Sequence, residues 1–98
     1  MDAKKVSLQT ELLSLVEKEL GFAIVDDTMH AIVFDREGHV CYTNAYIPLH
    51  FYTELRDFHV KALEQQCLDE IKITSPYMDM VYFSLPGTSY CAFVIFKL

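Results

Sequence analysis

Residues 30–46 read HAIVFDREGHVCYTNAY. The segments HAIVFD and HVCYTN are rich in β-branched and aromatic residues and flank the short segment REG, which is the pattern of a β-hairpin. Gly38 can adopt the positive φ angle that a tight turn requires. Asp35 can accept hydrogen bonds from backbone N–H groups in the turn, and Asn44 can cap the chain as it leaves the sheet. This stretch therefore predicts the first two strands of a sheet.

Helical periodicity is found on both sides of this hairpin. Before it, apolar residues recur every three or four positions between a possible N-cap at Ser7 and a stop at Gly21, namely Leu8, Leu12, Leu13, Val16 and Leu20. After it, the same period returns from Ile47 to about Ile71, with Leu55, Phe58, Ala62, Leu63, Cys67 and Ile71. The sequence predicts an N-terminal amphipathic helix within residues 1–21 and a long middle helix after the hairpin.

The last third of the chain predicts a second hairpin. The strand-like segments MDMVYFSL and SYCAFVIFKL are joined by Pro86 and Gly87, which suit the centre of a type II turn, and a short strand over residues 71–74 precedes them. The final strand is apolar at both alternating positions, so both of its faces must be covered and it is central in the sheet, beside residues 30–34. The expected fold class is α+β, a five-stranded antiparallel sheet with the N-terminal helix on one face and the middle helix on the other. Its core spans residues 22–98.

Length and composition exclude several classes of protein. The 98 residues are sized for one domain, and a hydrophobic content of 52% excludes intrinsic disorder. The net charge of -6 opposes contact with phosphate backbones, so no direct nucleic-acid binding is expected. No apolar run is long enough for a membrane span or a signal peptide. Cys41, Cys67 and Cys91 fit neither a disulfide framework nor a paired zinc motif, which predicts a reducing, cytoplasmic location.

The hairpin motif resembles that of the PAS family. Asp35-Arg36-Glu37-Gly38 is similar to the family's D-x-x-G turn, and Asn44 to the Asn that ends its second strand. The segment GTSYCAFV, residues 87–94, is similar to the final PAS hairpin. The resemblance extends over residues 22–98, with one long helix where the family usually has several short ones. It implies a PAS-like fold and a sensor or dimerisation domain of a signalling or transcription-regulatory protein, acting on an output domain or partner protein.

Such a module is expected to bind a small apolar or aromatic ligand, mainly by burial. The pocket is predicted between the middle helix and the sheet, where Thr43 or Tyr90 is available for hydrogen bonding. The strand and helix periods give its lining as Ile32, Phe34, Cys41, Thr43, Leu55, Phe58, Leu63, Tyr90, Ala92 and Val94.

The other face of the final strand predicts a homodimer. Lys97 is the one charge in that strand, so Phe93 and Ile95, which share its parity, are expected to point away from the pocket. One helix covers only a band of a five-stranded sheet, so a second copy of the N-terminal helix would complete the cover. The helix would contribute an apolar stripe of Leu8, Leu12 and Val16.

A roadblock or longin-like scaffold is the alternative interpretation. These folds have nearly the same order of helices and strands, but they serve protein assembly rather than ligand sensing. The segment with Met78, Met80, Tyr82 and Phe83 fits either half-buried strand residues or an adaptable binding surface.

No combination of residues predicts an enzyme, a metal site or a cofactor. The sequence lacks a nucleophile motif and a phosphate-binding glycine loop, and the cysteines are expected to pack in the core. His50 and His59 are nine residues apart on the middle helix and therefore lie on opposite sides, unlike the ligands of a two-His metal site. The PAS resemblance offers His59 as the one position for a haem ligand, but an ordinary, partly exposed histidine is expected there.

Overall fold

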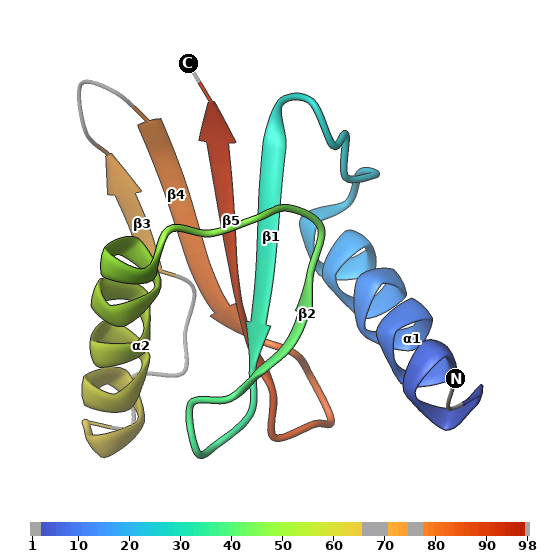
Figure 1. Ribbon diagram of the computed structural model, residues 1–98, viewed down its shortest axis with the longest axis horizontal. Helices are drawn as coiled ribbons and strands as arrows, with labels where there is room; N and C mark the ends of the chain where they lie inside the picture. Colours follow the sequence, from blue (N-terminus) through green and yellow to red (C-terminus); the bar gives the residue numbers. More distant parts are fainter. Residues whose placement is uncertain (1–2, 66–70, 75–77, 98) are drawn as a thin grey trace.

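The computed structural model describes residues 3–65, 71–74 and 78–97. The helices and strands follow one another as Figure 1 shows. In chain order they are α1 (Ala3–Leu20), β1 (Met29–Phe34), β2 (Val40–Thr43), α2 (Leu49–Glu64), β3 (Ile71–Thr74), β4 (Met78–Ser84) and β5 (Cys91–Lys97).

The helix ends follow from local chemistry. Helix α1 stops at Gly21, whose N–H still donates to the carbonyl of Glu17 at 2.9 Å and whose φ of 85° then turns the chain out of the helix. Helix α2 begins after the extended residue Pro48. The predicted extension of this helix to Ile71 is wrong, because Ile71 begins β3; Cys67 lies outside the described residues. The predicted strand over residues 71–74 is confirmed. Neither helix, over its described residues, is long and apolar enough to cross a membrane.

The five strands form one sheet in the order β2-β1-β5-β4-β3, and every neighbouring pair is antiparallel. The final strand is therefore central, with β1 beside it, as predicted. Its residues 91–95 are all buried, because both faces of this strand are covered by helices. Strands β2 and β3 form the two edges.

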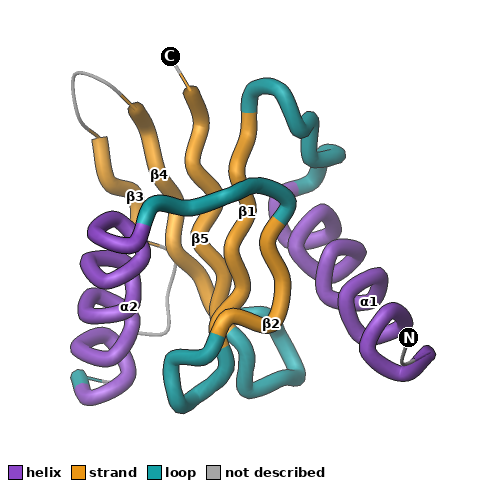
Figure 2. Tube along the Cα trace, viewed as in Figure 1, coloured by secondary structure: helices purple, strands orange, loops and turns teal. Residues whose placement is uncertain are grey.

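The two helices pack on opposite faces of the sheet, as predicted for the N-terminal helix and the middle helix. Figure 2 shows α2 toward β3 and β4, and α1 beside β2. On the α1 face, the buried residues are Leu12, Val16, Ala31, Val33, Phe83, Leu85, Ala92 and Val94. On the α2 face, they are Ile32, Phe34, Leu55, Ala62, Tyr82, Cys91, Phe93 and Ile95.

The predicted orientation of β5 is wrong. Ala92 and Val94 face α1, whereas Phe93 and Ile95 face α2. The pairing of β1 with β5 fixes this orientation, because Ile32 lies opposite Phe93 and directly opposed residues share a face. Alternation within β5 could not reveal it, since both parities are apolar and the single charge is at the strand end.

Candidate functional site

Among the described residues, aromatic side chains pack together between α2 and the sheet, where a ligand pocket was predicted. Phe93 of β5 is at the centre of this group and is surrounded by rings from β1, α2 and β4. Its ring centroid lies 4.6 Å from that of Tyr82, 5.7 Å from that of Phe58 and 5.9 Å from that of Phe34. Such spacings are those of rings in direct contact. Two of the residues expected to line a pocket, Phe34 and Phe58, therefore pack against Phe93 instead.

The predicted lining residues are divided between the two faces of the sheet. Cys41 and Tyr90 pack against the α1 face together with Ala92 and Val94, and Thr43 is exposed. A register shift between Val33 and Phe34 makes β2 irregular, so alternation along the sequence does not give the orientation of Cys41. The members that remain on the α2 face are Ile32, Phe34, Leu55, Phe58 and Leu63.

His59 lies within this aromatic group and both of its ring nitrogens are hydrogen-bonded. Nε2 is 2.7 Å from the carbonyl oxygen of Asp35, and Nδ1 is 2.8 Å from the hydroxyl of Tyr82. A carbonyl can only accept, so Nε2 carries the proton and the neutral ring accepts the Tyr82 hydroxyl proton at Nδ1. The ring also stacks on Phe34, with centroids 5.2 Å apart.

The environment of His59 keeps it neutral. Burial lowers the pKa of His59, and this effect outweighs the hydrogen bond to the Asp35 carbonyl, which favours the protonated ring. Burial likewise raises the pKa of the Tyr82 hydroxyl and of the Cys91 thiol. The expected partial exposure of His59 is wrong, since its exposed fraction is 0%. With both nitrogens engaged inside the core, the residue is arranged as a structural link.

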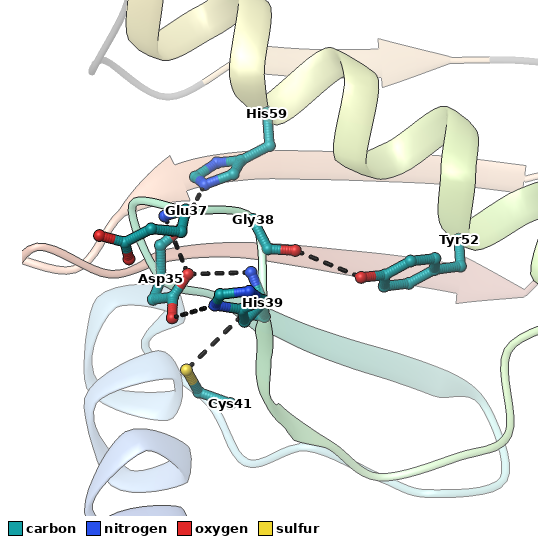
Figure 3. A network of polar contacts seen from close by, with 7 residues as sticks. All are labelled: Asp35, Glu37, Gly38, His39, Cys41, Tyr52 and His59. Atoms are coloured by element: carbon teal, nitrogen blue, oxygen red, sulfur yellow. Dashed lines mark hydrogen bonds and ion pairs between the residues drawn. The ribbon is translucent and has the colours of Figure 1, made fainter.

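The turn between β1 and β2 is held by Asp35 and by α2 (Figure 3). Asp35 Oδ1 accepts the backbone N–H groups of Glu37 and His39, each at 2.9 Å, and Oδ2 lies 3.2 Å from His39 Nδ1. From α2, the Tyr52 hydroxyl donates to the carbonyl of Gly38 at 3.2 Å, and His59 donates to that of Asp35. The turn and the helix therefore form one connected polar network.

This turn also brings together three groups that could ligate a metal ion. Ligand atoms of Asp35, Glu37 and His39 lie within 4.8 Å of one another. However, the Asp35 carboxylate is already occupied by the turn. Partial burial raises the pKa of Asp35, but hydrogen bonds from the backbone and side chain of His39 outweigh it and hold this pKa below its ordinary value. The role that the geometry supports for Asp35 is the turn-forming one predicted from the sequence.

The residues predicted to form a dimer interface are largely enclosed in the single chain. Leu12 and Val16 are buried against the sheet, Leu8 is half-buried beside them, and Phe93 and Ile95 lie beneath α2. None of these five offers an open apolar surface.

Other apolar residues are exposed instead: Phe22 and Val25 precede β1, Tyr46 precedes α2, and Leu49 is the first residue of α2. The exposed fraction is 85% for Tyr46, 76% for Leu49, 52% for Val25 and 49% for Phe22. Sequence reasoning missed them because apolar residues in a short connection have no period from which burial can be judged. The only signal was the pair Tyr46 and Leu49 next to Pro48, at the expected start of the middle helix.

Comparison with known proteins identifies the fold. No protein-family model matches the sequence, and no curated protein matches it either. Among solved structures, MglB with a tetrameric arrangement is similar over 99% of this chain and 76% of its own, with a TM-score of 0.61 and 17% sequence identity. MglB has a roadblock/longin fold. The fold of this chain is of that type.

The predicted PAS fold is therefore wrong. The residues behind that resemblance are real hairpin features: Gly38 has a φ of 85°, and Asn44 Oδ1 accepts the N–H of Ala31 at 2.9 Å. Gly38 stabilises the turn, and Asn44 fixes the chain where it leaves β2. Any fold that begins with such a hairpin can use these two features. The similarity to MglB is the finding that separates the two interpretations.

Proposed function

We propose that this chain is a non-enzymatic protein-interaction module that associates with further copies of itself. The observation that carries the proposal is the aromatic group under α2, which occupies the space that a ligand-sensing module would keep open. The likeness to MglB, which was solved in a tetrameric arrangement, supports the same interpretation. The proposal follows the roadblock or longin-like scaffold interpretation and not the interpretation as a PAS-like sensor.

The edge strand β3 is the surface that we propose for self-association. An edge strand presents backbone groups that can pair with a strand of another chain. Of the two edges, β2 is accompanied by α1, whereas none of the described helices or strands lies beyond β3 (Figure 1). Two copies joined through β3 would extend the sheet symmetrically, which is the arrangement that a self-complementary interface requires.

We also propose that the protein is located in the cytoplasm. Cys41 and Cys91 are free thiols, as expected in a reducing compartment. Membership in a signalling or transcription-regulatory protein remains a prediction from the sequence.

Proline substitution at the β3 edge tests the proposal. Backbone N–H groups alternate in direction along a strand, so one of Lys72→Pro and Ile73→Pro removes a bond to β4 and the other removes an outward N–H. The variant that retains the wild-type thermal midpoint identifies the outward position. We expect that variant to sediment as a monomer while the wild type sediments as a dimer or larger. If Lys72→Pro and Ile73→Pro both fold and both keep the oligomeric mass of the wild type, pairing through β3 is contradicted.

A further inference from the structure

Two turns lie side by side at one end of the sheet, because the strand register places them there. Phe34, the last residue of β1, is opposite Cys91, the first residue of β5, and Cys91 is also opposite Ser84, the last residue of β4. The β1–β2 turn and the β4–β5 turn therefore leave the sheet from the same row of residues. Figure 1 shows both turns at the end of the sheet where α2 also ends.

A cavity of about 430 Å³ opens between these turns and the end of α2. Arg36 lines it from the β1–β2 turn and Leu63 from the last turn of α2. The other described lining residues, 84–91, belong to the β4–β5 hairpin. We call this space the turn cavity. Its volume is in the range of sites that bind small molecules.

The hairpin side of the turn cavity has a fixed shape and two unused donors. The Thr88 N–H and hydroxyl donate to the Leu85 carbonyl, at 3.1 Å and 2.7 Å, and the hydroxyl accepts the Tyr90 N–H at 3.1 Å. These bonds hold the turn in one conformation. By contrast, the N–H groups of Gly87 and Ser89 donate to none of the described residues. The turn therefore contributes two backbone donors that a ligand can use.

Arg36 gives the turn cavity a positive charge. It is the only charged residue in the described part of the lining, and its guanidinium has no ion pair or hydrogen bond with the described residues. The acidic residues next to the lining in sequence, Glu37 and Glu64, are not part of it. A guanidinium presents N–H donors in a planar fork that matches a carboxylate or a phosphate. The lining therefore favours an anion, although the net charge of the whole chain is -6.

We propose that the turn cavity binds a small organic anion. Its carboxylate or phosphate group contacts Arg36, and its apolar body contacts Leu63 and Pro86. The N–H groups of Gly87 and Ser89 are further donors in the same lining. The site is separate from the aromatic group under α2 and from the β3 edge, so the inference goes beyond the proposed self-association and does not depend on it.

Two pairs of small molecules test the proposal. Benzoate is paired with its neutral analogue benzamide, and phenyl phosphate with its neutral analogue phenol. Each is titrated into the isotopically labelled full chain, and the backbone amide signals are followed by NMR. We expect at least one of the two anions to shift the signals of Gly87 and Ser89 saturably, with a Kd about tenfold or more below that of its neutral analogue. The anion with the lower Kd identifies carboxylate or phosphate as the preferred group.

The two arginines of the chain provide a matched pair of variants. Arg36 lines the turn cavity, whereas Arg56 lies on α2 outside its lining, and both side chains are exposed. Arg36→Gln should raise the Kd of the tighter-binding anion by about fivefold or more, whereas Arg56→Gln should change it by less than about twofold. Both variants should keep the wild-type thermal midpoint.

Several results would overturn the proposal. One is that neither anion shifts the signals of Gly87 and Ser89. Another is that a neutral analogue binds as tightly as its anion, because the charge of Arg36 would then contribute nothing. Equal Kd values for Arg36→Gln and Arg56→Gln would likewise show that any attraction comes from overall charge and not from the turn cavity.

Sedimentation separates this proposal from the proposed function. Arg36→Gln is expected to keep the oligomeric mass of the wild type while binding the anion more weakly. A monomeric wild type that binds the anion through Arg36 would reject self-association and support the inference. A self-associating wild type whose amide signals do not respond to either anion would overturn the inference and leave self-association standing.

Discussion

At the scale of single residues, His59 makes folding stability depend on pH. Its pKa in the folded chain is lowered by burial, whereas the unfolded chain has the ordinary value of about 6.5. Below that pH the unfolded chain binds a proton that the folded chain does not, so the free energy of unfolding falls as the pH decreases. The urea midpoint should therefore be lower at about pH 5.5 than at about pH 7.5. An unchanged midpoint would show that His59 can be protonated in place.

The hydrogen bonds of the buried His59 ring also depend on Tyr82, whose hydroxyl contacts Nδ1. Tyr82→Phe removes the hydroxyl hydrogen that His59 Nδ1 accepts. Leaving buried polar groups unsatisfied costs about 1–3 kcal/mol, so the free energy of unfolding should fall by that amount. Tyr46→Phe is the matched control, because this hydroxyl belongs to a side chain that is 85% exposed. If the two variants unfolded at the same urea concentration, the hydroxyl of Tyr82 would have no structural role.

At the scale of the elements, the turn between β1 and β2 depends on Gly38. Its φ of 85° is unfavourable for other residues, and a Cβ atom there would lie 3.0 Å from Arg56 Nε. Gly38→Ala should reduce the free energy of unfolding by about 1–2 kcal/mol in urea titration. Gly87→Ala is a useful comparison, because Gly87 has a φ of 75° but no neighbouring atom within 4 Å of the position that a Cβ atom would occupy. A Gly38→Ala variant less affected than Gly87→Ala would argue against the contact with Arg56.

Because α1 packs on the sheet of its own chain, substitutions on its buried side should reduce folding stability rather than dimerisation. Leu12 is 1% exposed and packs on the sheet of its own chain. Leu12→Glu would bury an unpaired carboxylate and should reduce the free energy of unfolding by several kcal/mol. Leu13→Glu, on the half-buried side of the same helix, should reduce it much less. If Leu12→Glu changed only the oligomeric mass and left the thermal midpoint in place, α1 would be an intermolecular element after all.

Local chemistry made the elements predictable, whereas orientation and packing depended on distant residues. The hairpin at residues 30–46 follows from β-branched runs around Gly38, and α1 from the spacing of leucines that ends at Gly21. The orientation of β5 is set by its register with β1, which alternation cannot reveal in a strand that is apolar at both parities. The filled space under α2 depends on how four rings from four elements interlock, and no single segment contains that information.

At the scale of the whole molecule, the two helices cover both faces of the sheet, and none of the described helices or strands lies beyond the β3 edge. The central strand β5 is enclosed by α1 and α2, so the molecule buries its most apolar segment without a partner. A second copy of α1 is therefore not needed to cover the sheet, and the proposed self-association uses the β3 edge instead. A net charge of -6 keeps other contacts between copies weak.

Sedimentation equilibrium of the purified wild-type chain tests the central claim most directly. At concentrations of roughly 10 µM and above, self-association predicts a mass of at least twice the chain mass of 11.3 kDa, falling toward one chain on dilution. A constant mass of 11.3 kDa across this range would contradict the claim that the chain is a self-associating interaction module.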